Sequence, residues 1–241
     1  MTIIDHHPSL SPELTVDPTS ALAFDALRNI HKGIRAELFA VVGSAGNVDP
    51  GDRAGRAALA AHVGDVVELL VDHAGHEDAH VLPVLEAHGP SLLARISSDH
   101  ADLEGRLARI VDRTAEMTDS PAGEQRARVH NLYLDLASYT GAYLGHQEFE
   151  ERVVMPSLLA AIGVDGALDV HHSIVSSIPP PVMAKSLAVM IPAMNVEDRA
   201  ELLAGVQNDA RPEVFDGVWG LTRSVITAAD FRALATRLGR N

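Results

Sequence analysis

The chain has 241 residues, of which 46% are hydrophobic and only 4% aromatic, and its formal net charge is −14 at pH 7. This charge argues against a nucleic-acid partner or an anionic membrane surface, because both need a basic face. The sequence contains no cysteine, which excludes disulfides, iron–sulfur clusters and thiolate metal sites, so any metal must have nitrogen and oxygen ligands.

Alanine and leucine dominate the hydrophobic residues, and this favours helices over sheets. We therefore expect an all-α protein. The first residues do not have the basic and apolar regions of a secretory signal, and no stretch reads as apolar over the ~20 residues that a membrane span requires. The sequence thus predicts a cytoplasmic protein without membrane association.

Residues 1–18 are predicted to form an N-terminal tail. The spacing of apolar residues then predicts four amphipathic helices, at 19–43, 53–87, 91–117 and 123–162. Short connections between such helices imply an antiparallel up-down four-helix bundle, which we assign to residues 19–163.

Residues 164–241 are predicted to form a C-terminal extension of three or four short helices. The run SSIPPP at 176–181 breaks the chain, Asn195 and Thr227 are expected to cap helices, and Pro212 is expected to open one. We expect this extension to pack on the bundle or on another chain, so a homodimer formed through it is one candidate assembly.

Two of the bundle helices carry the same signature at the same spacing. It appears as His73-x3-Glu77-x5-Pro83 and again as His146-x3-Glu150-x5-Pro156. A histidine and a glutamate four residues apart lie on one helix face, with their Cβ atoms about 5–6 Å apart. The repeat indicates a duplicated helical hairpin that holds metal, and each proline is expected to bend or end its helix.

Each predicted bundle helix also has a histidine near its middle. These four residues are His31, His73, His100 and His146. Buried glutamates facing them would be neutralised or would need cations, so two metal ions bridged by Glu77 and Glu150 and capped by the histidines fit this ligand count. Nitrogen and oxygen ligands suit iron, manganese or zinc.

Two of these four histidines are predicted to lie at different heights along the bundle. His31 lies ~12 residues before the first predicted loop and His73 ~20 residues after it, an offset of about 12 Å at 1.5 Å per residue. The helix boundaries or the loop geometry must absorb this difference. At the other end of the bundle, Glu77 and His100 lie at similar distances from the turn at Gly89 and Pro90.

Two other interpretations were weighed against this metal site. A ferritin-like centre uses two Glu-x-x-His pairs plus two further glutamates, and the bundle contains only one such pair, Glu77-x2-His80. That pattern therefore fails. A structural helical protein with incidental histidines stays open as an alternative.

The six residues resemble the hemerythrin-like, or HHE, family over roughly residues 19–162. The resemblance rests on His31, His73-x3-Glu77, His100 and His146-x3-Glu150, together with the endings VLP and VMP of the second and fourth helices. It implies that these residues ligate two non-haem iron ions, with bridging glutamates and an oxo or hydroxo bridge. It says nothing about residues 164–241.

The sequence departs from the invertebrate oxygen carriers of this family at two places. Those proteins have His-x3-His on the third helix and His-x4-Asp on the fourth, whereas this chain has His100-x3-Glu104 and His146-x3-Glu150. Reversible oxygen carriage is therefore not expected. The pattern is closer to bacterial members linked to peroxide, nitric oxide, or iron and oxygen sensing.

The functional hypothesis is redox chemistry on a small oxygen species such as O2, H2O2 or NO, with peroxide disproportionation if the protein is an enzyme. The alternative is a protein that binds or senses O2, NO or iron without turnover. No separate acid–base pair is evident, so the metal centre itself would do most of the chemistry. His80 and Glu104 are further candidate ligands, Tyr143 is a candidate donor to a bound oxygen species, and Asp72 and Asp99 are candidate partners of ligand histidines.

Overall fold

The computed structural model describes residues 26–240 of the chain. Within this part every regular element is a helix and there is no strand, as the composition predicts. The tail predicted at 1–18 and the first predicted helical residues, 19–25, lie outside the described residues.

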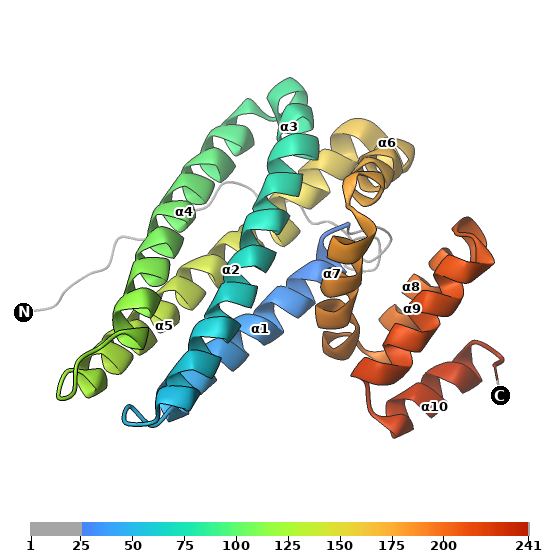
Figure 1. Cartoon of the computed structure of the whole chain (residues 1–241). Coiled ribbons are helices and arrows are strands. Elements are labelled where there is room, and N and C mark those ends of the chain that lie inside the picture. Colours follow the sequence, from blue (N-terminus) through green and yellow to red (C-terminus); the bar gives the residue numbers. More distant parts are fainter. Residues whose placement is uncertain (1–25, 241) are drawn as a thin grey trace, which may run out of the picture.

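Four long helices form an antiparallel bundle (Figure 1). They are α1 (Arg28–Asn47), α2 (Arg53–His80), α4 (Pro90–Thr118) and α5 (Gln125–Phe149). Both α1 and α4 pack against α2 and α5, so the apolar stripes of all four helices meet in one core. Each helix contributes buried residues to this core, for example Ile34, Leu70, Leu107 and Leu132. The predicted up-down four-helix bundle is confirmed.

Helix α1 ends later than predicted, because Gly43 does not stop it. The helix continues to Asn47, and its last turn includes the buried Ala45. Burial of that turn offsets the roughly 1 kcal/mol that a glycine costs inside a helix. The shift also reduces the mismatch in level, since His31 now lies 16 residues before Asn47 and His73 lies 20 residues after Arg53.

The two prolines of the repeated signature have different effects. At Pro83 the chain breaks as predicted, because α2 ends at His80 and the short helix α3 (Leu82–His88) begins. At Pro156 the helix does not end. A π-helical turn, η1 (Glu150–Val154), joins α5 to α6 (Met155–Ser177), and the wider turn accommodates a proline that cannot donate a backbone hydrogen bond.

The predicted end of the fourth helix near residue 162 is confirmed. Gly163 has a φ of 71° and a ψ of 178°, a conformation outside the helical region that glycine adopts readily, and it separates two helical segments within α6 at a kink. Beyond the kink, Ala167, Val170 and Ile174 pack with Val81 and Leu85 from the α2–α3 region. The kink lies at the predicted boundary between the bundle and the extension, and the division of the chain into domains stays a prediction.

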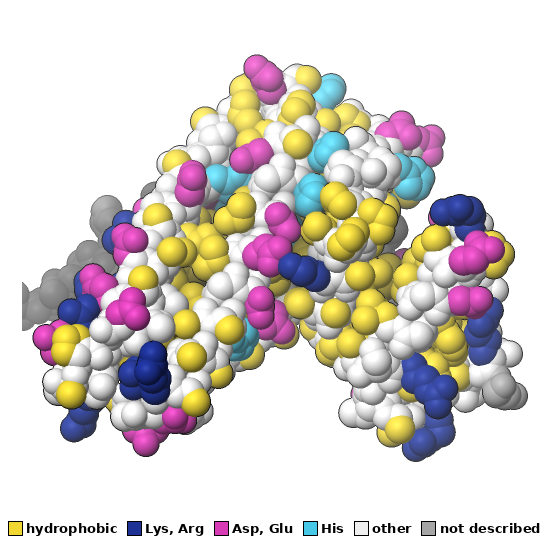
Figure 2. Space-filling model, in the orientation of Figure 1, with side chains coloured by type: hydrophobic (Ala, Val, Ile, Leu, Met, Phe, Trp, Pro, Cys, Tyr) yellow, Lys and Arg dark blue, Asp and Glu magenta, His cyan; other side chains and the backbone are white. Residues whose placement is uncertain are grey.

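The stretch Gln125–Ser177 contains an 18-residue window that is long and apolar enough to cross a membrane, and 22% of that window is buried. The sequence was expected to have no such stretch, and by the length and the composition of this helix that expectation is wrong. Part of α6 packs on α3. Because a helix in the core of a protein can be equally long and apolar, the window is weak evidence for a membrane span. Figure 2 shows hydrophobic side chains gathered over α6 and α7.

Four short helices form the C-terminal extension. They are α7 (Pro180–Ala193), α8 (Val196–Asp209), α9 (Pro212–Val225) and α10 (Ala228–Arg237). The predicted caps are confirmed, because the Asn195 side chain accepts hydrogen bonds from two backbone N–H groups of α8 and the Thr227 hydroxyl accepts one from α10. Pro212 opens α9 as predicted.

Helix α7 attaches the extension to the bundle by packing along α1 (Figure 1). The two backbones approach closely at Gly33, where an added Cβ would lie 3.0 Å from a Val189 methyl and 3.2 Å from the Met190 Cα. Lys32 also forms an ion pair with Asp198 of α8. The extension is thus fastened to the helix that carries His31.

Candidate metal centre

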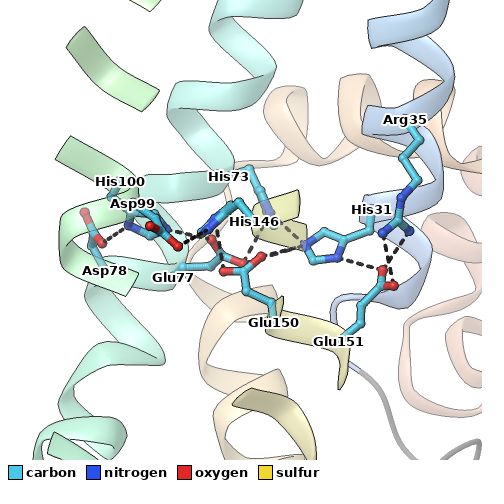
Figure 3. Close-up of polar contacts among 10 residues, drawn as sticks. All are labelled: His31, Arg35, His73, Glu77, Asp78, Asp99, His100, His146, Glu150 and Glu151. Atoms are coloured by element: carbon cyan, nitrogen blue, oxygen red, sulfur yellow. Dashed lines mark hydrogen bonds and ion pairs between the residues drawn. The ribbon is translucent and has the colours of Figure 1, made fainter. Parts of the chain in front are cut away.

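The six predicted ligands converge inside the bundle, where their side chains point toward one another (Figure 3). Two overlapping groups have ligand atoms that all lie within 4.8 Å of one another. One group is His31, His73 and Glu77, and the other is Glu77, His100, His146 and Glu150. Each span is short enough for one ion to contact every member.

Glu77 belongs to both groups and turns one carboxylate oxygen toward each. Its Oε1 lies 3.2 Å from Nε2 of His73, and its Oε2 lies 3.6 Å from Nε2 of His100. Both groups therefore share this one carboxylate, which is the arrangement expected of a bridge between two cations.

Glu150 has a similar orientation on the opposite helix. Its Oε1 lies 3.3 Å from Nε2 of His146, and its Oε2 lies 3.5 Å from Nε2 of His31. It stands on the first residue of the π-helical turn, and such turns are frequent at functional sites. Two carboxylates thus lie between the same two histidine groups.

Four buried atoms without a hydrogen-bond partner face the interior of this cluster, while Nδ1 of His146, also without one, faces outward toward Asp99. The four interior atoms are both carboxylate oxygens of Glu77, Oε2 of Glu150 and Nε2 of His100. A buried polar group without a partner costs roughly 1–3 kcal/mol, and a charged one costs more. Because every one of these four atoms faces another candidate ligand, bound cations would satisfy all of them, and the residues present fit a pair of metal ions.

An ordered set of contacts holds His31 from outside the cluster. Its Nδ1–H donates to Oε1 of Glu151 at 2.9 Å, while the guanidinium of Arg35 donates to both oxygens of Glu151 at 2.7 and 3.0 Å (Figure 3). A carboxylate on the second ring nitrogen of a ligand histidine fixes its orientation and raises its basicity. Nε2 of His31 is therefore aimed at the interior.

Two of the other histidines have outer contacts that are exposed or long. Nδ1–H of His100 donates to Oδ1 of Asp78 at 2.8 Å, on the exposed side of the bundle. Nδ1 of His146 lies 3.9 Å from Oδ2 of Asp99, which is too long for a hydrogen bond. Asp99 therefore lies on the side of His146 where a hydrogen-bond acceptor was predicted, but it is too far away to accept the bond. The sequence analysis did not predict Asp78 as a partner of His100.

Electrostatics divide the four histidines into two kinds. Burial opposes charge on His31 and His100, but the carboxylates that face them raise the pKa of each to about 9, through Glu151 and Glu77 for His31 and through Glu77 and Asp78 for His100. Burial lowers the pKa of His73 and of His146 to about 4. Each group thus contains one histidine that is protonated without metal and one that is ready to ligate.

The pKa values of the carboxylates also shift in opposite directions. Burial works against ionisation of Glu77, but the neighbouring histidines, His73 first, hold its pKa below the usual value. Burial and the charge of Glu77 raise the pKa of Glu150 well above its usual value. Hydrogen bonds from His31 and Arg35 overcome burial and lower the pKa of Glu151 to about 2.

The structure does not bring the two further candidate ligands into the cluster. His80 lies within hydrogen-bonding distance of the Ser173 hydroxyl through Nδ1, at 2.9 Å, and Glu104 is exposed. Neither belongs to a group of candidate ligands among residues 26–240. Helical spacing alone placed both near the site, and the rotation of each helix turns them away from it.

Tyr143 does lie beside the centre, as predicted. It is 4% exposed, and its ring centroid lies 5.7 Å from that of His146. Burial raises the pKa of its phenol well above the usual value. The sequence did not point to Arg35 or Glu151. Glu151 directly follows the predicted ligand Glu150, and Arg35 lies one helical turn after the predicted ligand His31.

A buried pair of carboxylate-bridged histidine groups inside a four-helix bundle defines a class of metal-binding helical proteins. The family model of the hemerythrin HHE cation binding domain matches residues 22–158, more than half of the chain, and the protein therefore belongs to this family. The resemblance seen in the sequence is confirmed. No curated protein and no solved structure matches the chain.

Proposed function

We propose that this protein binds two iron ions between α1, α2, α4 and α5 and acts on a small oxygen species, with hydrogen peroxide as the substrate that we expect it to disproportionate. The observation that carries the proposal is the shared position of Glu77, whose two oxygens face different histidine groups and have no other partner. The membership of the chain in a cation-binding family supports it.

The ligand set favours iron over softer metals. All candidate ligand atoms are imidazole nitrogens or carboxylate oxygens, which suit iron, manganese or zinc. Among these, iron and manganese supply the redox chemistry that peroxide disproportionation needs. Because the group with His31 has only three candidate ligands, an ion there would keep open positions for a small molecule.

The remaining residues have supporting roles in this proposal. The Arg35–Glu151 ion pair orients His31, and the aliphatic core around Leu38, Val66 and Leu103 limits the access of bulk water. Tyr143 offers a phenol beside His146 for a bound oxygen species. The net charge of −14 argues against a nucleic-acid partner, and a cytoplasmic location is part of this proposal.

Metal analysis together with an absorption spectrum tests the proposal. We expect about two irons per chain, near-ultraviolet absorption that the metal-free protein does not have, and rapid oxygen evolution from hydrogen peroxide. A His73→Ala variant should lose both the iron and the absorption, while a His88→Ala variant, changed outside the cluster, should keep them. Protein without iron in the wild type would refute the proposal.

A second candidate is a protein that senses oxygen or nitric oxide without turnover. The contact between α7 and Gly33, two residues from His31, favours it, because movement of α1 on ligand binding would be felt by the extension. Reversible spectral change under oxygen or nitric oxide, with no oxygen evolution from peroxide, would favour this candidate. A dimer that forms through the extension would supply its output surface.

A further inference from the structure

Two tyrosines lead away from the metal centre along one face of α5. Tyr143 contacts His146 with ring centroids 5.7 Å apart, and Tyr139, one helical turn earlier, lies 5.7 Å from Tyr143. These separations are those of aromatic rings in contact. Both rings are buried, at 4% and 3% exposure, in a core whose other buried members are aliphatic side chains and one methionine.

The far end of this pair reaches the surface. Tyr139 lines a shallow pocket of about 260 Å³, a volume that includes open solvent. The pocket lies between α4 and α5, and its other lining residues are Arg106, Arg109, Ile110, Asp135 and Ser138. The space inside it that a water-sized molecule can occupy is about 40 Å³, so a small ligand would lie mostly on the open face of this pocket.

The charges around the pocket favour an anion. Arg106 donates to Asp102, and Asp135 lies 3.4 Å from Nε of Arg113. Arg109 donates to the Gly105 carbonyl, and within residues 26–240 no carboxylate forms a salt bridge with it. In a strongly acidic protein, a guanidinium without a carboxylate partner is a local attraction for small anions.

We propose that Tyr143 and Tyr139 relay electrons to the metal centre from a small anionic hydrogen-atom donor, of the enediolate class, bound beside Arg109. The protein would then reduce peroxide at the expense of this donor as well as disproportionate it. This inference rests on the proposed function, since it needs a redox-active centre next to His146.

The overall step balances as one hydrogen peroxide and two donor molecules giving two waters and two donor radicals. The peroxide O–O bond breaks, and each donor loses one electron and one proton from an O–H bond. With iron held by the six ligands to supply the redox chemistry, the Tyr143 phenol would give up one electron and one proton in each transfer, and the proton would pass to a peroxide oxygen that leaves as water. Tyr143 recovers a hydrogen atom from Tyr139, and Tyr139 recovers one from the donor.

The composition of the chain makes this relay simple to test. The sequence has three tyrosines and one tryptophan. The third tyrosine, Tyr133, also lies on α5 but stacks on His130, and Trp219 belongs to the separate cluster of the extension. A Tyr133→Phe variant is therefore a matched control in the same helix.

The experiment uses full-length iron-loaded protein, mixed with hydrogen peroxide and frozen within milliseconds for electron paramagnetic resonance, with ascorbate as the donor in parallel assays. We expect a tyrosyl radical in the wild type and in Tyr133→Phe, and none in Tyr143→Phe. Tyr139→Phe should retain a radical with altered hyperfine structure, while its ascorbate oxidation falls about tenfold or more.

The pocket is tested by a second pair of variants. Arg109→Ala should raise the KM for ascorbate without changing oxygen evolution from peroxide alone, whereas Arg53→Ala, changed at the exposed start of α2, should leave both unchanged. Global replacement of tyrosine by 3-fluorotyrosine should change the radical signal through the fluorine coupling, and this measurement does not depend on a variant that folds.

The outcomes separate the relay from the proposed function. If iron content and oxygen evolution are normal but Tyr143→Phe keeps the radical and oxidises ascorbate at the wild-type rate, the relay is wrong and the proposed function stands. A wild-type protein without any tyrosyl radical also overturns the relay. If the protein binds no iron, the proposed function itself fails.

Discussion

The two halves of the metal centre use similar ligands but are supported differently. In the half that contains His31 and His73, the two histidines are 0% and 6% exposed, and Glu151 and Arg35 brace His31 through three hydrogen bonds. In the other half, the side chain of His100 is 11% exposed, and its partner Asp78 is 53% exposed. One half is enclosed and braced, while the other borders solvent.

This difference indicates a division of roles between the halves. A hydrogen bond that is shielded from water holds a ligand histidine more firmly than one that water can replace. We therefore expect the half with His31 to define the geometry of the centre, and the half with His100 to be the side from which ions enter and leave.

The largest effect should come from the residue that the halves share. Glu77→Ala removes a carboxylate from both groups, and we expect iron to fall from about two ions per chain to near none, because Glu77 is a candidate ligand in each group. Metal analysis after dialysis measures this. Glu104→Ala, an exposed change on α4, is the control and should keep its iron. Retention of one full equivalent by Glu77→Ala would show that the halves are independent.

The brace on His31 should rank second. Glu151→Gln leaves the shape but weakens the hydrogen bond to Nδ1 of His31 and the ion pair with Arg35. Loss of such a partner typically lowers metal affinity about 10–100-fold. Competition with a chelator measures the affinity of each ion. Arg35→Met, which leaves Glu151 in place, should have a smaller effect, and equal loss in both variants would contradict the role given to Glu151.

The dependence on pH should be alike in both halves. Without metal, His31 and His100 have pKa values of about 9, so both carry a proton at pH 7, and an ion must displace it. Binding should therefore strengthen as the pH rises toward 9, by about tenfold per pH unit for each proton displaced. Calorimetry in two buffers counts the protons released. An affinity that does not change between pH 7 and 8 would show that neither histidine is protonated.

The smallest effect should come from the exposed side. Asp78→Asn keeps a hydrogen-bond acceptor for His100, and water can replace what is lost because the side chain is half-exposed. We expect a loss in affinity of about tenfold or less, below that of Glu151→Gln. The same chelator assay compares the two variants directly, and a larger loss in Asp78→Asn would reverse the assignment of the braced half.

Much of the site could be predicted because it depends on spacing within single helices. The pairs His73 with Glu77 and His146 with Glu150 follow from a four-residue separation, which places side chains on one face in any helix. The helix caps at Asn195 and Thr227 follow from equally local hydrogen bonds. The local rule had exceptions at two places, because burial of Ala45 outweighed the preference of Gly43 and the π-helical turn before Pro156 accommodated the proline.

Other features could not be read from spacing because they join distant segments. Arg35 and Glu151 are 116 residues apart in the sequence, and their contact depends on the level at which α1 packs beside η1. The same packing turns His80 and Glu104 away from the centre, although both have helical spacing to a ligand. It also brings Tyr139 to a surface pocket that is formed by α4.

The sequence by itself thus determined an all-α chain of the hemerythrin HHE cation-binding family and the six residues that meet in its interior. Only the tertiary structure decided that Glu77 and Glu150 each face both histidine groups, that the outer partner of His31 is partly buried while that of His100 is exposed, and that α7 packs on α1. The physical reason is that backbone geometry relates residues within one helix, whereas the rotation and level of one helix against another are set by side-chain packing.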